Sequence, residues 1–432
     1  MEIVLLCLII VLALYFAMML GANDLANSMG TSVGSGAISW RKGIIIAAIM
    51  ELAGAVCFGH QVTDTLTTGL FTDLVLNQSA TKLLLGMVAV LLVCGVGLQG
   101  VNRLGLPVAT SHGIVGALLG FALGIAGTAG INWQQVSFIA VAWVITPLLA
   151  GIVAWLGIKF MEHWIDQGRL MEWLPWLTGL TLAVVGSSLL HAMGSHSDTQ
   201  RWLIVALWLI GTALATSYLI PQREGIFSQL QVMSAATMAF AHGSNDVGNA
   251  IAPLFIALNA FNVLKYGHGG DLPLSSEMVS PTWLLLLGGI GIVLGLIFFG
   301  KRVLATVGQD ITLITPKTGF VAELAASTTV LIGSALGIPA SSTHALVGAV
   351  VGIGIAHHGS TANMAATRSQ ANSSASNQVL ASQTVISTTI STTPILNWQL
   401  IIQILKAWLL TIPLTTITTI MLYRLLTISP SR

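Results

Sequence analysis

Long apolar stretches alternate with short polar breaks along nearly the whole chain. Each stretch approaches the roughly 20 residues that a helix needs to cross a 30 Å hydrocarbon core, and we delimit about 12 of them. The predicted spans are 3–20, 43–60, 82–98, 105–128, 136–158, 175–191, 203–220, 229–258, 282–299, 320–336, 340–356 and 399–422. The pattern therefore predicts an all-α polytopic membrane protein.

The composition agrees with a protein whose solvent is lipid. Hydrophobic residues make up 55% of the 432 positions and charged residues only 7%, which leaves too little polar surface for a water-soluble globule. The formal net charge of +1 comes with no basic stripe, so nucleic acid is excluded as a partner. We expect a multi-pass protein of the plasma (inner) membrane.

The loop charges orient this protein in the membrane. If the loops alternate between the two sides, ten of the sixteen basic residues fall on one side, which the positive-inside tendency makes cytoplasmic. The N-terminus is then outside. The basic residues on the cytoplasmic side are Arg41, Lys42, Arg103, Lys159, Arg169, Arg223, Lys301, Arg302, Lys317 and Arg368.

The chain divides into three parts. Residues 1–158 form a first transmembrane repeat, 159–228 a cytoplasmic link with connecting spans, and 229–432 a second transmembrane repeat. The second repeat includes a segment, 357–398, that is rich in Ser, Thr, Ala and Asn. This composition predicts a flexible connector in preference to a functional lid.

Two pairs of internal repeats support this division. Gly-Ala-Asn-Asp-Leu-Ala-Asn at 21–27 matches Gly-Ser-Asn-Asp-Val-Gly-Asn at 243–249, and Leu-Gly-Leu-Pro-Val-Ala-Thr-Ser-His at 104–112 matches Leu-Gly-Ile-Pro-Ala-Ser-Ser-Thr-His at 336–344. The order of the motifs is the same in both halves, which indicates a duplicated unit. In the predicted topology the first Asn-Asp helix runs inward and the second outward, so the repeats are inverted and meet at the bilayer midplane.

The Asn-Asp motifs are suited to binding a cation. An ionised Asp inside a bilayer costs on the order of several kcal/mol unless it is paired or coordinates a cation. Asn residues one position before and three after each Asp can bring amide oxygens to the same helix face, and the neighbouring glycines would allow the helix to unwind. The alternative is an Asp that caps a broken helix. The candidate sodium ligands are Asn23, Asp24, Asn27, Asn245, Asp246 and Asn249.

The second pair of motifs is suited to binding an anion. A Gly and a Pro shortly before hydroxyl residues predict the start of a half-helix, whose free backbone N–H groups attract a tetrahedral oxyanion. The alternative is that the hydroxyls cap helices or join them in lipid. The candidate phosphate donors are Thr110, Ser111, Ser341, Ser342 and Thr343. His112 and His344 follow directly, and we favour packed groups over ligands for them.

Charge balance favours symport. The carboxylates of Asp24 and Asp246 would repel an anion, so sodium ions or protons must bind with it. Two further acids, Glu51 and Glu323, lie in apolar helices at positions that the repeats do not relate. Each is a candidate ion site or gate, with a structural hydrogen bond as the alternative. No cofactor is expected besides the coupling Na⁺ or H⁺.

The motifs at 21–28 and 242–253 and the two Pro-x-x-[Ser/Thr]-[Ser/Thr]-His elements closely resemble the inorganic phosphate transporter (PiT) family. The resemblance implies a homodimeric, inverted-repeat symporter that moves phosphate with sodium or protons. It also implies that the Asn and Asp groups bind cations, that the half-helix ends bind phosphate, and that Glu51 and Glu323 match acids kept in the family. This chain has Ala109 where the family usually has Ser, and Gly248 where it usually has Ala.

Three other functions compete with phosphate symport. Some members of the family carry sulfate, so the identity of the oxyanion stays open. A passive anion channel needs no paired acids. An intramembrane hydrolase is suggested only by the Gly-x-Ser-x-Gly match at 30–34, which continues a membrane helix instead of forming a strand-turn-helix elbow. We expect no enzyme.

Overall fold

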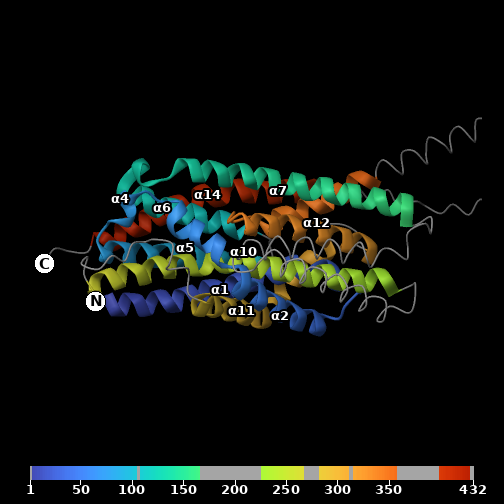
Figure 1. Ribbon diagram of the computed structural model, residues 1–432, viewed down its shortest axis with the longest axis horizontal. Helices are drawn as coiled ribbons and strands as arrows, with labels where there is room; N and C mark the ends of the chain where they lie inside the picture. The colour runs from blue at the N-terminus through green and yellow to red at the C-terminus, as the bar shows by residue number, and fades with distance from the viewer. Residues whose placement is uncertain are drawn as a thin grey trace, which may run out of the picture.

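The computed structural model describes residues 2–104, 108–165, 225–266, 282–310, 315–357 and 398–428. Within these ranges the protein is an elongated bundle of helices (Figure 1). The elements are α1 (Glu2–Gly34), α2 (Trp40–Phe58), α3 (His60–Asp64), η1 (Thr65–Gly69), α4 (Asp73–Leu76), α5 (Ala80–Leu104), α6 (Thr110–Ala126), η2 (Gly127–Gly130), α7 (Trp133–Phe160), η3 (Met161–Ile165), α10 (Ile226–Tyr266), α11 (Thr282–Asp310), α12 (Pro316–Ala335), the helix Ser342–His357, and α14 (Trp398–Thr427).

The all-helical membrane architecture is confirmed for the described part of the chain. Seven of its helices are long and apolar enough to cross a membrane, or up to eight if α2 and the segment His60–Gly69, bent by 59°, form one span. The predicted spans 175–191 and 203–220 lie outside the described residues, as do most of the link and nearly all of the segment 357–398. The total of about 12 spans therefore stays a prediction.

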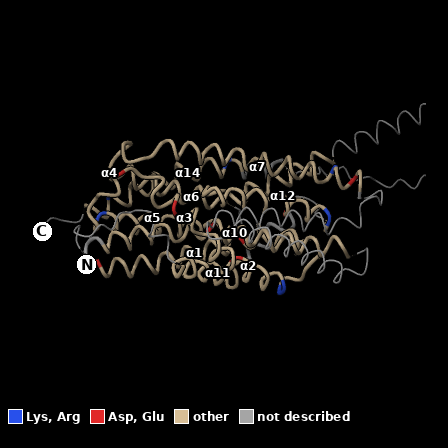
Figure 2. Tube along the Cα trace, in the orientation of Figure 1, with Lys and Arg blue, Asp and Glu red and all other residues tan. Residues whose placement is uncertain are grey.

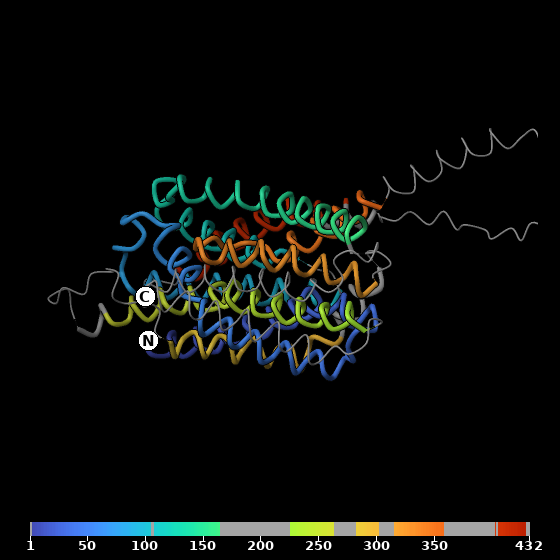
Figure 3. Tube along the Cα trace, turned by 45° about the vertical axis from the view of Figure 1, so that its right-hand side comes forward, coloured from blue at the N-terminus to red at the C-terminus, as the bar shows by residue number. Residues whose placement is uncertain are grey.

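The two Asn-Asp motifs lie inside long, unbroken helices. α1 and α10 pack against each other and run in opposite directions (Figures 1 and 3). Our expectation that the glycines unwind these helices is wrong. A Cβ on Gly21 would overlap the backbone carbonyl oxygen of Ile292 in α11, and one on Gly243 would overlap that of Glu51 in α2. The glycines therefore allow helix backbones to approach closely, as small residues do in membrane bundles.

The second pair of motifs forms the tips of two helical hairpins. α5 leads to α6, which begins at Thr110, and α12 leads to the helix that begins at Ser342. Gly337 has φ +68°, a left-handed conformation that ends α12 and that only glycine adopts at little cost. The predicted starts of both half-helices are confirmed. Residues 105–107 lie outside the described part.

The tips of these two hairpins meet inside the bundle. The Thr343 hydroxyl donates a hydrogen bond of 3.3 Å to the backbone carbonyl of Val108. The imidazole rings of His112 and His344 lie with their centroids 4.6 Å apart. The N-terminal ends of α6 and of the helix Ser342–His357 are therefore brought together.

Around this junction the bundle has a buried apolar core, and its outer helices form a lipid-facing surface. Large buried side chains such as Phe16, Leu84 and Phe121 pack α1, α5 and α6 into one apolar cluster. α7 and α14 expose apolar side chains, among them Val144, Leu148, Ile152, Leu409, Leu414 and Ile417. Lys and Arg lie toward the ends of the bundle, whereas some acidic residues lie near its middle (Figure 2).

Candidate cation and anion binding site

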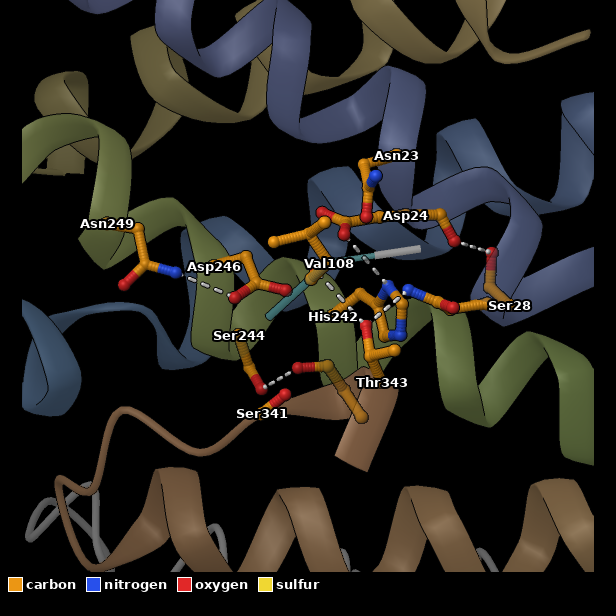
Figure 4. Close-up of polar contacts among 12 residues, drawn as sticks. Asn23, Asp24, Ser28, Val108, His242, Ser244, Asp246, Asn249, Ser341 and Thr343 are labelled. Carbon is orange, nitrogen blue, oxygen red and sulfur yellow. Dashed lines mark hydrogen bonds and ion pairs between the residues drawn. The ribbon is translucent and has the colours of Figure 1, made fainter. Parts of the chain in front are cut away.

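Two aspartates from different halves of the chain face each other in the core. Asp24 on α1 and Asp246 on α10 are each 1% exposed, and so is His242, one turn before Asp246. Ligand atoms of these three side chains lie within 4.8 Å of one another, and His242 Nδ1 is 3.9 Å from Asp24 Oδ1 (Figure 4). This arrangement brings together two motifs that are separated by more than 200 residues and can hold one cation between two carboxylates.

Most side-chain oxygens of the Asn and Asp residues in the two motifs lack donors among the described residues. Asp246 Oδ1 accepts a 2.8 Å hydrogen bond from Asn249 Nδ2. The buried oxygens with no hydrogen-bond partner among the described residues are Asn23 Oδ1, both Asp24 carboxylate oxygens, Asn245 Oδ1, Asp246 Oδ2 and Asn249 Oδ1. A buried acceptor without a donor costs about 1–3 kcal/mol. A hard cation between Asp24 and Asp246 would satisfy unpartnered oxygens of both carboxylates.

Hydrogen bonds to the amide nitrogens fix the orientation of two of these side chains. Asn23 Nδ2 donates to Asn102 Oδ1 at 2.9 Å, and Asn245 Nδ2 donates to Ser334 Oγ at 3.1 Å. Asn102 lies on α5 and Ser334 on α12, the first arms of the two hairpins. With each nitrogen held by a hairpin, the amide oxygen is left as the free ligand atom.

One contact ties the cation motif directly to the junction of the hairpin tips. Asn27 Nδ2 donates to Thr343 Oγ1 at 3.0 Å, and the same hydroxyl donates to Val108 O. In the described part of the chain the corresponding residue of the second motif, Asn249, bonds within its own helix, to Asp246. The structure thus brings Asn27 and Thr343 together, whereas Asn249 makes no such bridge among the described side chains.

The predicted phosphate donors all lie at the two helix N-termini, but their hydrogen bonds differ. Thr110 and Ser111 are the first residues of α6, whose N-cap residue, Ala109, offers no side-chain cap. Ser111 Oγ is buried without a partner in the described part of the chain. In the other half-helix Ser341 is a cap, because its Oγ accepts the backbone N–H of His344 at 3.2 Å. The α6 end therefore has uncapped N–H groups that can bind an anion.

The two glutamates have different surroundings. The Glu323 carboxylate accepts hydrogen bonds from Thr31, from Ser32 at 2.8 Å and from Ser234 at 2.7 Å. Glu51 is 0% exposed, and neither of its carboxylate oxygens has a partner among the described residues. A buried carboxylate without a partner among the described residues fits an ion-handling group better than a structural hydrogen bond.

Three residues at the site were not assigned from the sequence. His242 directly precedes the second Asn-Asp motif, and only the fold shows that it lies beside Asp24. Asn102 and Ser334 occupy equivalent positions when the two hairpin motifs are aligned. Extending that alignment two residues toward the N-terminus could have found this pair.

The packing favoured for His112 and His344 is seen in the structure, but the tryptophans they pack on were not assigned from the sequence. His112 packs on Trp143, with ring centroids 3.9 Å apart, and His344 packs on Trp408, at 3.5 Å. These four rings, called the aromatic box below, join the two tips to α7 and α14. A third internal repeat gave the signal, because Asn-Trp-Gln at 132–134 and Ala-Trp at 142–143 recur at 397–399 and 407–408.

Comparisons with known proteins agree with these features. The model of the phosphate transporter family matches residues 20–419. A Haemophilus influenzae protein for which phosphate permease activity is proposed is 36% identical over 383 residues, covering 83% of this chain and 90% of that protein. The chloroplastic inorganic phosphate transporter 2-1 of Arabidopsis thaliana is also 36% identical, over 79% of this chain and 64% of its own length. A solved structure titled "The sodium-dependent phosphate transporter" superposes with a TM-score of 0.81 and 28% identity, covering 99% of this chain and 100% of that chain.

Proposed function

The chain belongs to the phosphate transporter family, and from this premise we propose that it is a secondary active symporter for inorganic phosphate and a cation. It is an integral, multi-pass membrane protein. The observation that carries the proposal is the pair of facing aspartates with unpartnered oxygens, which the Asn27 contact connects to the junction of two helix N-termini. The first feature suits a cation and the second suits an oxyanion.

Cation coupling follows from the charges. Two buried carboxylates repel an anion unless cations bind beside them. We favour sodium over protons because amide and carboxylate oxygens dominate the site, and because the structural relative is titled as sodium-dependent. The six Asn and Asp residues are then cation ligands and Thr110, Ser111, Ser342 and Thr343 phosphate donors, while Ser341 supports the site as a cap.

Transport by alternating access is the mechanism that we propose. The antiparallel α1 and α10 and the hairpins that meet at their tips support inverted repeats, which in transporters surround a central site and rock around it. We further propose a homodimer in the plasma (inner) membrane that needs no cofactor, and we propose that the chain is a carrier and not an enzyme.

Uptake of radiolabelled phosphate into proteoliposomes tests this proposal. Sodium and proton gradients are imposed separately, and we expect the sodium gradient to drive accumulation. Uptake that depends on neither gradient would refute symport and favour a passive channel. Weak competition by excess sulfate is expected of a phosphate carrier, whereas equal competition would favour a general oxyanion permease.

Variants of the two aspartates test the site. Asp24→Asn and Asp246→Asn remove the charge at nearly constant volume, so we expect both to lose coupled uptake while remaining folded. Asp73→Asn is the matched control, because Asp73 is exposed in α4, away from the core. Near-normal coupled uptake by either core variant would refute the assignment.

A further inference from the structure

The two histidines of the aromatic box lie at the proposed anion site. His112 is the third residue of α6, and His344 is the third residue of the helix Ser342–His357. Side chains on a helix lean toward its N-terminal end. The two rings also touch each other where the tips meet, so both lie beside the N–H groups that would hold the oxyanion.

Hydrogen bonds define which nitrogen of each ring carries the proton. His112 Nδ1 lies 3.4 Å from the carbonyl oxygen of Trp408, and His344 Nδ1 lies 3.4 Å from that of Trp143. A carbonyl oxygen only accepts, so each Nδ1 must donate. In a neutral imidazole the other nitrogen, Nε2, then carries a lone pair.

Each Nε2 is an acceptor without a donor. The two side chains are 5% and 3% exposed, and neither Nε2 has a hydrogen-bond partner among the described residues. Since Nε2 lies across the ring from Nδ1, it points away from the carbonyls of α7 and α14. A sodium ion prefers oxygen ligands, so a hydrogen-bond donor is the better match for this nitrogen.

We propose that Nε2 of His112 and of His344 accept a hydrogen bond from the hydroxyl of a hydrogen phosphate and thereby select protonated oxyanions over sulfate. The proposal rests on the proposed phosphate function and adds to it the basis of specificity. HPO₄²⁻ and H₂PO₄⁻ each carry a P–OH group, whereas sulfate at neutral pH has none. A site built to accept a substrate hydroxyl rejects an analogue that lacks it, because its own buried acceptor stays unpaired.

Three competitors of labelled phosphate uptake test this proposal. Monofluorophosphate has nearly the shape and charge of HPO₄²⁻ but carries fluorine in place of the hydroxyl, sulfate lacks the hydroxyl, and arsenate has it. We expect the wild-type protein to bind sulfate and monofluorophosphate about tenfold or more weakly than phosphate, and arsenate about as well as phosphate. Equal competition by monofluorophosphate and phosphate would overturn the proposal without any variant.

Variants then locate the acceptor. His112→Phe and His344→Phe keep ring packing but remove Nε2, so the preference for phosphate over monofluorophosphate should shrink in each. Ser111→Ala is the matched control at the same helix end, because losing a donor weakens all four anions alike and leaves the ratio unchanged. If the preference for phosphate over monofluorophosphate is unchanged in both Phe variants, or is lost only in His242→Phe, these two histidines do not accept the hydrogen bond from the phosphate hydroxyl. Absence of any gradient-driven phosphate uptake by the wild-type protein would instead refute the proposed function.

Discussion

Alanine at Gly21 tests whether the glycines of the Asn-Asp motifs serve close packing of helices or only lower the helix propensity of their own segment. A methyl group there would overlap the carbonyl oxygen of Ile292, so α1 and α11 would have to separate by roughly 1.5 Å to restore ordinary contact. The obstacle is a backbone atom and cannot rotate away. Overpacking of this kind costs typically about 1–3 kcal/mol, and we take the upper end.

The two explanations predict opposite signs of the stability change. If Gly21 only weakened the helix and made no close contact, alanine would stabilise the helix by up to about 1 kcal/mol. With packing included, the expected net loss is about 2 kcal/mol, which lowers the thermal midpoint by a few degrees. Coupled uptake should also fall, because Asn23 and Asp24 move with α1, and a 1 Å misplacement can cost up to about 100-fold.

The assay compares apparent unfolding midpoints of detergent-solubilised protein at one scan rate, since large membrane proteins often unfold irreversibly. Gly97→Ala is the control, because Gly97 lies in α5 and a Cβ added there would meet nothing within 4 Å. We expect Gly97→Ala to be neutral or stabilising. A midpoint for Gly21→Ala that equals or exceeds the wild-type value would refute the packing argument.

Two other predictions concern contacts seen at the site. Glu323→Gln places an amide opposite hydroxyl donors and should lower the free energy of unfolding by about 1–3 kcal/mol. If Glu323 also binds a cation, added sodium should raise the thermal midpoint of the variant less than that of the wild type. An unchanged sodium response would assign Glu323 a structural role. In a background without the native cysteines, a cysteine pair at Asn27 and Thr343 should cross-link readily without substrate, because these side chains are in contact. A pair at the equivalent positions, Asn249 and Ser111, should cross-link much less, because Asn249 is bonded to Asp246 instead. Equal cross-linking of both pairs at rest would contradict the observed asymmetry.

The fold class could be predicted from the sequence because lipid constrains the backbone strongly. Each span must satisfy its own hydrogen bonds, so apolar runs become helices. The predicted end of the first span at residue 20 is wrong, because the polar motif that follows does not break the helix. α1 continues to Gly34 because several of its buried polar side chains, such as Asn23, Asn27 and Ser32, meet partners on other helices.

The candidate ligands could be predicted from the repeats, but their partners could not. Residue spacing within one helix shows that Asp24 and Asn27 share a face. It does not show which residue of another helix lies opposite, since that depends on how helices are aligned after folding. His242 beside Asp24 is such a contact, and so is the Asn102 bond to Asn23.

The two halves of the site are equivalent in sequence but not in their contacts. Asn23 and Asn245 both donate to the first arm of a hairpin. One turn further on, Asn27 donates to the opposite hairpin, whereas Asn249 turns back to Asp246. A carrier with inverted repeats can exchange the roles of its halves between its two facing states. Under the proposed mechanism, the bond from Asn27 to the opposite hairpin and its absence at Asn249 among the described residues therefore mark one such state. The other state would reverse these two contacts, while both aspartates remain ligands of the cation.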